Sequence, residues 1–335
     1  MLRGTRIAAL CYHTRALSSA LDINPNLCHT LKILIVGDGN FSYSVAIAKA
    51  FNALSITATS LDTKQELLAM YPTASQNLLT LKKIPTIQVR HGIDATKLAS
   101  YDLPMFDRIV FNFPHSYEAN GTRHNKISNH RRLLLNFLLS CQSVLATQGQ
   151  VWIALCAGQG GTFAEEIKRL HGDTWQIEQC AANANMLVTN VTRFPLDTLT
   201  ALGYESTGYR KDAKGFYTHS SLYHVLSRPG NGITALYPLK WCRDMSFWAK
   251  NDILDTFPTL VQDAIVSWLQ ADYQVDGIDC IDTYTCMKRK QTSFCFRINI
   301  STKIRALSEK DVALVFGKLG VYIESLGLGE YRAPK

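Results

Sequence analysis

The first two thirds of the chain alternate short apolar runs with longer segments of helical periodicity. Five runs have the length and β-branched content of buried strands: residues 32–36, 56–61, 86–90, 108–111 and 150–157. Three segments have the apolar spacing of helices: residues 43–52, 126–147 and 162–171. Two further strands are expected at 175–182 and 221–227. Strands that alternate with helices predict an α/β, Rossmann-like domain over residues 31–228.

A different pattern follows the linker-like run Arg-Pro-Gly-Asn-Gly at 228–232. Its segments are a strand at 241–249, a helix at 252–270, strands at 274–286 and 292–300, a helix from Ser308 and an end strand at 328–332. Asp311 stands where the acidic residue of a capping box would stand if Ser308 were the N-cap. The order β-α-β-β-α-β predicts an α+β ferredoxin-like domain over residues 235–335.

The composition agrees with two globular domains. The chain has 335 residues, 47% hydrophobic and 19% charged, and domains of about 100–200 residues are usual. Disorder and collagen-like repeats are therefore excluded. An uncharged stretch of 32 residues between Arg132 and Glu165 is interrupted by polar and glycine residues, eight of them between Asn136 and Gln150. It predicts a buried helix, a polar turn and a buried strand, and no membrane partner is expected.

The positive charge lies mostly in the first part of the chain. The formal charge is +8; residues 1–230 hold 22 basic and 15 acidic residues, whereas residues 231–335 hold 13 and 12. A basic first part favours a polyanionic partner such as RNA. Ordinary scatter of surface charge is the alternative.

The nine cysteines show no metal-ligand spacing. Their number is odd, no Cys-x-x-Cys occurs, and most lie in apolar runs. This usage is typical of free, buried thiols in a reducing compartment. No metal site is expected, because a structural zinc site needs closer ligand pairs.

The N-terminal arm, residues 1–30, has the composition of a mitochondrial presequence. Arg3, Arg6 and Arg15 precede the first acid, Asp22, among Ser, Thr, Ala and Leu residues. The run from Arg15 to Leu17 before two serines is similar to a processing site. We therefore expect mitochondrial import. A frayed basic terminus, with a nucleolar or cytoplasmic protein, is the alternative.

A glycine turn follows the first predicted strand at once. Residues 37–42 are Gly-Asp-Gly-Asn-Phe-Ser, and a predicted helix begins at Tyr43. Strand, glycine turn and helix form a nucleotide-binding opening, because glycines allow close backbone approach and the helix start offers free N–H groups. Ser42 stands where the full Gly-x-Gly-x-x-Gly pattern has its third glycine. A plain turn is the alternative.

Acidic residues follow the next two predicted strands. Asp62 lies 23 residues after Gly39, where an acid commonly accepts hydrogen bonds from ribose hydroxyls, although it could also cap the next helix. Asp94 follows the third strand. Ligands bind at the carboxyl ends of parallel strands, so both positions predict an adenosine-containing cofactor. This geometry does not distinguish a dehydrogenase from a methyltransferase.

The fourth predicted strand ends in Asn112, Phe113, Pro114 and His115. Amine-methylating enzymes often carry Asn/Asp-Pro-Pro-aromatic there. The carboxamide and a backbone carbonyl accept N–H hydrogen bonds, proline fixes the turn, and a flat side chain stacks on the base. Here Phe113 replaces the first proline and His115 replaces the aromatic residue. His115 can stack, donate a hydrogen bond or accept a proton; an ordinary loop histidine is the alternative.

Four blocks together carry a specific resemblance: residues 37–42, 92–96, 107–115 and 155–159. Over residues 31–228 the chain resembles the Rossmann-like domain of the fungal large-subunit rRNA (uridine-N3)-methyltransferase family. The resemblance implies S-adenosylmethionine as methyl donor and a uridine N3 of ribosomal RNA as acceptor. The cofactor-binding residues that it implies are Gly37, Asp38, Gly39, Asn40, Phe41, Ser42, Asp62 and Asp94. The residues that it implies around the target base are Asn112, Phe113, Pro114 and His115.

Methylation at uridine N3 requires that a proton leaves and that the base is exposed or flipped. His115 is the candidate proton acceptor. Family members often have a glycine soon after the Asn-Phe-Pro-His block, whereas this chain has Ser-Tyr-Glu at 116–118. The loop and helix start that follow are basic, and the candidate contacts to RNA phosphates are Arg123, Lys126, Arg131 and Arg132. A solvated loop is the alternative.

Residues 235–335 carry a second resemblance, through the motifs at 237–238, 243–248 and 293–298. They resemble the ferredoxin-fold anticodon-binding domain of phenylalanyl-tRNA synthetases. Arg243 and Arg297 are the candidate RNA contacts, and tRNA-like RNA or assembly proteins are candidate partners. The leading hypothesis is an RNA methyltransferase that acts on ribosomal RNA or a ribosome assembly intermediate. The alternatives are a catalytically inactive assembly factor with this fold and, more remotely, a dinucleotide oxidoreductase.

Overall fold

The computed structural model describes residues 12–24, 30–51, 53–116, 122–207 and 217–332. The chain divides into two compact units, Met1–Leu236 and Tyr237–Lys335. Within the described ranges, no helix combines the length and apolar character that crossing a membrane would require.

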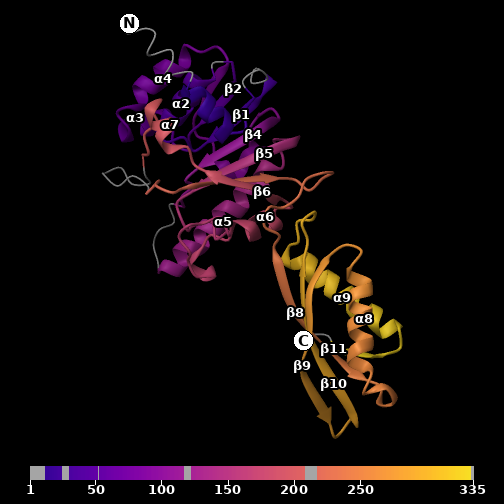
Figure 1. Ribbon diagram of the computed structural model, residues 1–335. Coiled ribbons are helices and arrows are strands. Elements are labelled where there is room, and N and C mark those ends of the chain that lie inside the picture. Colours follow the sequence, from indigo (N-terminus) through magenta and orange to yellow (C-terminus); the bar gives the residue numbers. More distant parts are fainter. Residues whose placement is uncertain (1–11, 25–29, 52, 117–121, 208–216, 333–335) are drawn as a thin grey trace. The chain divides into compact units, whose positions relative to one another are not determined.

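The first unit is built on a seven-stranded sheet (Figure 1). Its strands are β1 (Lys32–Val36), β2 (Ser55–Thr59), β3 (Ile87–Arg90), β4 (Phe106–Asn112), β5 (Leu145–Leu155), β6 (Leu187–Arg193) and β7 (Leu222–Ser227). The strand order is β3-β2-β1-β4-β5-β7-β6; β1 to β5 run parallel, and β7 is antiparallel to both of its neighbours. The order reverses between β1 and β4, where open α/β sheets bind their ligands. The expected α/β, Rossmann-like class is confirmed by this strand order.

Helices cover both faces of this sheet. Successive residues of a strand point to opposite faces, so a strand of apolar residues needs a packing partner on each face. The helices are α2 (Ser42–Ala50), α3 (Lys64–Met70), α4 (Ala74–Lys82), α5 (Arg123–Cys141), α6 (Ile177–Asn183) and α7 (Leu196–Ala201), with short 3₁₀ turns η2 (Ala95–Ser100) and η3 (His171–Asp173). Ile33 and Ile35 of β1 belong to one apolar core, which includes residues of α2, α3, α4 and α7. Leu34 and Val36 belong to the other, with α5 and α6.

The helix predicted at 162–171 is wrong. Residues 162–170 form turns and bends, and Phe163 and Leu170 are 75% and 79% exposed. A helix with this spacing would need a surface on which to bury its apolar face. Instead the Glu165 carboxylate is buried and accepts hydrogen bonds from the backbone N–H groups of Gly158 and Gly160, at 2.6 and 2.9 Å. The glycine loop after β5 therefore determines the path of this segment.

The strand predicted at 175–182 is also wrong, because most of this segment forms α6. The fully or nearly buried residues of α6 and its C-cap are Ile177, Cys180, Ala181, Ala182 and Ala184. They follow helical spacing, and the run of small apolar residues was interpreted as a strand. The strand that pairs at this edge, β6, begins five residues later than the expected strand ended, at Leu187, and was not anticipated.

Part of the N-terminal arm packs into the core of the first unit, although the sequence suggested that it lies outside the fold. Residues 12–20 are helical, and Leu17, Leu21 and Ile23 are buried beside β1 and α2. The buried Arg108 guanidinium donates hydrogen bonds to the backbone carbonyls of Leu21 and Asp22. Residues 12–24 are therefore part of the first unit.

The second unit is a four-stranded antiparallel sheet with two helices on one face (Figure 1). Its elements are β8 (Lys240–Ala249), η4 (Asn251–Ile253), α8 (Phe257–Leu269), β9 (Gln274–Cys286), β10 (Gln291–Ser301), α9 (Glu309–Ser325) and β11 (Gly329–Arg332). The strand order is β11-β8-β10-β9. The predicted ferredoxin-like element order is confirmed, and Ser308 and Asp311 form the capping box at the start of α9.

Candidate functional site

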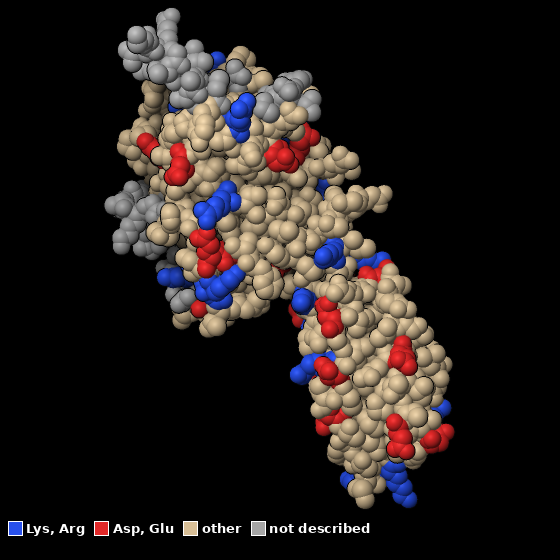
Figure 2. All heavy atoms as spheres, viewed as in Figure 1, with Lys and Arg blue, Asp and Glu red and all other residues tan. Residues whose placement is uncertain are grey.

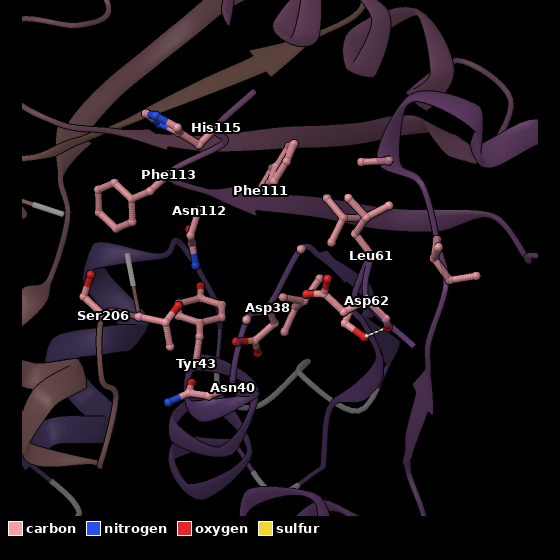
Figure 3. Close-up of a pocket in the computed structure, with 18 of the residues that line it drawn as sticks. Asp38, Asn40, Tyr43, Leu61, Asp62, Phe111, Asn112, Phe113, His115 and Ser206 are labelled. Carbon is pink, nitrogen blue, oxygen red and sulfur yellow. Dashed lines mark hydrogen bonds between the residues drawn. The ribbon is translucent and has the colours of Figure 1, made fainter. Parts of the chain in front are cut away.

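A pocket of about 370 Å³ lies at the carboxyl ends of β1, β2, β3 and β4 (Figure 3). Its acidic lining residues are Asp38, Asp62, Asp94 and Glu205. Among the described residues that line it there is no lysine or arginine. In the close-up, Asn112 points toward Tyr43 (Figure 3). The pocket therefore suits a ligand with a positive charge, and a bare phosphate group would be disfavoured in it.

The glycine turn at 37–40 keeps this pocket open. Gly37 has a φ of +65°, and a Cβ there would lie 2.8 Å from the Phe111 ring. A Cβ on Gly39 would lie 2.6 Å from the Thr207 hydroxyl oxygen. A larger side chain at either position would therefore displace Phe111 or Thr207, so the turn requires glycine at both positions.

The polar residues of the turn hold the start of α2. Asp38 is buried, and one of its carboxylate oxygens accepts hydrogen bonds from the Ser44 N–H at 2.9 Å and the Ser44 hydroxyl at 2.5 Å. Burial raises the pKa of Asp38 to about 6, although these hydrogen bonds oppose the rise. The Asn40 carboxamide oxygen accepts from the Ser42 N–H at 3.0 Å. Asp38 and Asn40 thus line the pocket and order its helix.

Phe41 and Ser42, which were expected to contact the cofactor, lie outside the pocket lining. Phe41 has a φ of 62° and is completely buried, with its ring edge against His91. The Ser42 hydroxyl is buried against the backbone of Glu205. Both residues therefore stabilise the turn by packing and hydrogen bonding, without lining the pocket.

Asp62 and Asp94 line the neighbouring part of the pocket, after β2 and β3. The N-cap of α3 is Thr63, so the capping alternative for Asp62 does not occur. The Asp94 carboxylate accepts hydrogen bonds from the Thr96 N–H and hydroxyl at 2.9 and 2.7 Å and lies 3.2 Å from the Lys97 ammonium. Burial raises the pKa of Asp94, but these contacts outweigh it and lower the pKa overall. Asp94 is therefore a rigid, charged side chain at this edge.

Asn112 ends β4 with a carboxamide that the protein leaves unsatisfied. Its oxygen and nitrogen are both buried, and neither makes a well-formed hydrogen bond among the described residues, although the carboxamide lies close to the hydroxyls of Tyr43 and Tyr223. Burial raises the pKa of Tyr43 to about 12; the hydroxyl of Tyr223 and the nearby Asn112 carboxamide oppose that rise. A buried, unpaired amide costs about 1–3 kcal/mol, so this one is suited to a ligand that supplies both a donor and an acceptor.

His115 lies at the pocket as part of an aromatic cluster. Its ring is 4.4 Å from that of His130, which stacks on Trp175 at 4.3 Å. Burial lowers the pKa of His130 to about 4, and its Nδ1 accepts a hydrogen bond from the Ser116 N–H at 3.2 Å. The neutral His130 thus anchors the backbone beside His115. Phe113 lines the pocket with a φ of 51°, whereas Pro114 does not.

The four basic residues expected to bind RNA near α5 have different environments. Arg131 donates hydrogen bonds to backbone carbonyls in the segment 171–174, so its guanidinium already has a structural role. Lys126 and Arg132 are exposed on α5. The side chain of Arg123 is outside the described part of the structure.

The two candidate RNA contacts of the second unit are paired with acids. The Arg297 guanidinium makes two hydrogen bonds with the Asp244 carboxylate, at 2.9 and 2.8 Å. Arg243 lies 3.6 Å from Glu309 and over the Trp241 ring. On the face shown in Figure 2, basic and acidic side chains are interspersed. An RNA that binds there must therefore compete with these ion pairs.

Sequence reasoning missed the wall formed by Tyr204, Glu205, Ser206 and Thr207. This segment follows α7, and its contacts with the glycine turn span 163 residues or more of sequence. Tyr43, in the first turn of α2, was also missed. A polar run after a short helix has no local signature of a site, so only the tertiary structure reveals it.

The fold and site define a Rossmann-like cofactor-binding domain followed by a ferredoxin-like domain. The chain belongs to the BMT5-like rRNA (uridine-N3-)-methyltransferase family, whose model matches residues 34–208. The resemblance inferred from the glycine-turn and Asn-Phe-Pro-His blocks is thereby confirmed.

Two curated relatives carry the name of the second domain. The chain is 37% identical to "Ferredoxin-fold anticodon-binding domain-containing protein 1" of Homo sapiens over 201 residues, 59% of this chain and 31% of that protein. It is 34% identical to the Mus musculus homolog over 221 residues, 64% of this chain and 33% of that protein. The chain thus spans about a third of the length of these relatives. The solved structure of TrmN from Thermus thermophilus is also similar, with a TM-score of 0.39, 16% identity, and coverage of 64% of this chain and 48% of that one.

S-adenosylmethionine is the cofactor of such a methyltransferase, and the residues present fit it. Gly37 and Gly39 line the pocket at the start of α2, and four carboxylates suit a cofactor that bears a sulfonium and an ammonium group. Asp62 and Asp94 line the pocket after β2 and β3, where Asp62 would hold the ribose hydroxyls of such a cofactor and Asp94 would lie beside its adenine.

Proposed function

We propose that this protein is an S-adenosylmethionine-dependent RNA methyltransferase whose target is a uridine N3 of ribosomal RNA, and that it acts in ribosome biogenesis. The observation that supports this most is the Asn112 carboxamide, which is buried at the pocket with both polar atoms unsatisfied. The Watson–Crick edge of uracil offers acceptors at O2 and O4, so the carboxamide N–H groups of Asn112 can recognise it while the N3 proton stays available to His115.

The bound cofactor would supply an electrophilic methyl group. The protein's own residues then have three tasks. The glycine turn, Asp62 and Asp94 hold the cofactor; Asn112 orients the base; and His115 accepts the proton that leaves N3. Positioning should account for most of the rate, because a sulfonium needs little further activation.

The acidic lining also determines what part of an RNA can enter. A phosphate would be repelled by the carboxylates, whereas an uncharged base would not. The target nucleotide would therefore be flipped into the pocket, with its backbone remaining outside near the exposed Lys126 and Arg132.

Mass-spectrometric mapping of methylated ribosomal RNA, with and without this protein, tests the proposal. We expect one methyluridine mark to disappear in its absence, to return with the wild type, and to stay absent with Asn112→Ala. Glu166→Gln, at an exposed ion pair with Arg193 outside the pocket lining, is the control and should restore the mark. If no methyl mark changes when the protein is absent, the alternative of a catalytically inactive assembly factor is favoured. If Asn112→Ala restores a lost mark, the role of Asn112 is wrong.

A further inference from the structure

The segment after α7 closes over the glycine turn through three contacts. The Ser42 hydroxyl donates to the Glu205 carbonyl at 3.1 Å and accepts from the Glu205 N–H at 3.0 Å. The Asn40 amide donates to the Glu205 carboxylate at 3.3 Å. Gly39 faces the Thr207 hydroxyl so closely that a Cβ would reach it. This segment is therefore a wall of the same pocket.

Glu205 and the acids suited to adenosine lie beside the ends of different strands of the sheet. Asp62 and Asp94 follow β2 and β3, which are adjacent in the sheet. Glu205 contacts the turn after β1, and β4, with Asn112, is the next strand beyond β1. A nucleoside over β2 and β3 would thus direct its sulfur and amino-acid part toward the turn after β1, which Glu205 contacts.

Glu205 also has hydrogen-bonding capacity left for a ligand. Among the described residues, the only hydrogen bond to its carboxylate comes from Asn40, at the long distance of 3.3 Å. The other acid near the turn, Asp38, uses one oxygen for two hydrogen bonds from Ser44 and is buried. Glu205 is exposed at the rim, so its charge is hydrated until a ligand covers it.

We propose that the Glu205 carboxylate binds the α-ammonium group of the methionine part of S-adenosylmethionine, as a binding residue that acts through its charge. This assignment rests on the proposed function, because it takes S-adenosylmethionine as the ligand. It predicts that Glu205 distinguishes ligands with an amino-acid part from those without one.

A comparison of three ligands by calorimetry tests the assignment. S-adenosylmethionine and S-adenosylhomocysteine both carry the ammonium group, whereas methylthioadenosine is a neutral thioether without it. Glu205→Gln keeps the acceptor for Asn40 and removes the charge. We expect Glu205→Gln to lower the affinity for S-adenosylmethionine and S-adenosylhomocysteine about fivefold to tenfold, as for one partly exposed charge-assisted contact. The affinity for methylthioadenosine should not change.

Asp62→Ala is the matched comparison, since all three ligands have a ribose, and it should weaken all three alike. Glu166→Gln, at an exposed ion pair with Arg193, should change none and controls for general charge effects. Equal affinities of wild type and Glu205→Gln for all three ligands, or an equal loss for all three, would overturn the role of Glu205 alone. A wild type that binds neither S-adenosyl ligand would overturn the proposed function together with it.

Discussion

The hydroxyl of Tyr223, on β7, donates a 2.9 Å hydrogen bond to the hydroxyl of Tyr43, on α2. Tyr43 in turn lies beside the Asn112 carboxamide (Figure 3). Both tyrosine rings are buried, and Tyr43 also lines the pocket. This pair connects the last strand of the sheet with the cofactor helix at the point where the target base would be read.

Replacing Tyr223 with Phe should slow methyl transfer without weakening cofactor binding. The Tyr43 hydroxyl would lose its donor and turn toward Asn112, which would change the orientation of the carboxamide. We expect turnover to fall about tenfold and the free energy of unfolding to fall by about 1 kcal/mol. Rates with saturating cofactor and calorimetric affinities measure the two effects separately. Tyr217→Phe, at an exposed tyrosine, is the control, and a loss of cofactor affinity in Tyr223→Phe would contradict the prediction.

The neighbours Arg131 and Arg132 should respond oppositely to substitution, although the sequence offers no reason to separate them. Arg132→Ala, combined with Lys126→Ala, should lower RNA affinity and make its salt dependence shallower, because two exposed charges leave α5. Arg131→Ala should instead destabilise the fold by about 2 kcal/mol, because carbonyls in the segment 171–174 lose their donor. Filter binding across a salt series and urea unfolding measure these quantities. A large loss of RNA affinity in stable Arg131→Ala would show that we have misassigned its role.

The sequence predicted those parts of the fold and site whose signals are local. The glycine turn at 37–42 is recognisable because it directly follows a strand and Gly37 takes a left-handed φ of +65°, and Ser308 with Asp311 forms a capping box within four residues. Prediction from the sequence failed where tertiary contacts determine the local structure. The segment 162–171 has helical spacing, but the burial of Glu165 against backbone N–H groups prevents a helix.

The sequence analysis did not identify the part of the site at residues 204–207 for the same reason. Glu205 reaches the pocket through contacts with Asn40 and Ser42, more than 160 residues away in sequence, and no periodicity encodes such a pairing. Arg131 is a candidate RNA contact in the sequence because it belongs to a basic cluster. The sequence carries no sign that backbone carbonyls already accept its hydrogen bonds. Burial and hydrogen-bond partners are properties of the folded chain alone.

The packing of the N-terminal arm makes a prediction about stability. Leu17 is completely buried, so Leu17→Ala should lower the free energy of unfolding by about 3 kcal/mol. Tyr12→Ala, at a residue that is 71% exposed, is the control and should have little effect. Denaturant unfolding measures both. Mitochondrial import remains a prediction, and cleavage after Leu17 would remove a core residue; N-terminal mass spectrometry of the protein from cells determines where any cleavage falls.

Asp38 and His130 should give the first unit two opposite pH dependences. Burial raises the pKa of Asp38 from 3.8 to about 6, so the folded state holds a proton that the unfolded state has lost, and stability falls as pH rises from about 4 to 6. Burial lowers the pKa of His130 from 6.5 to about 4, so the unfolded state takes up the proton first, and stability rises over nearly the same range. Each contribution amounts to about 3 kcal/mol, so the two largely cancel in the wild type.

Single substitutions should separate these two contributions. With Asp38→Asn, the stability relative to wild type should increase as pH rises from 4.5 to 7, because only the falling contribution is removed. With His130→Gln, which retains an acceptor for the Ser116 N–H, the relative stability should decrease over the same range. Urea unfolding of the three proteins at each pH gives the differences, in which the contributions of all other titrating groups cancel. Differences that do not vary with pH would mean that neither group has a perturbed pKa, and differences of the same sign would contradict at least one of the two assignments.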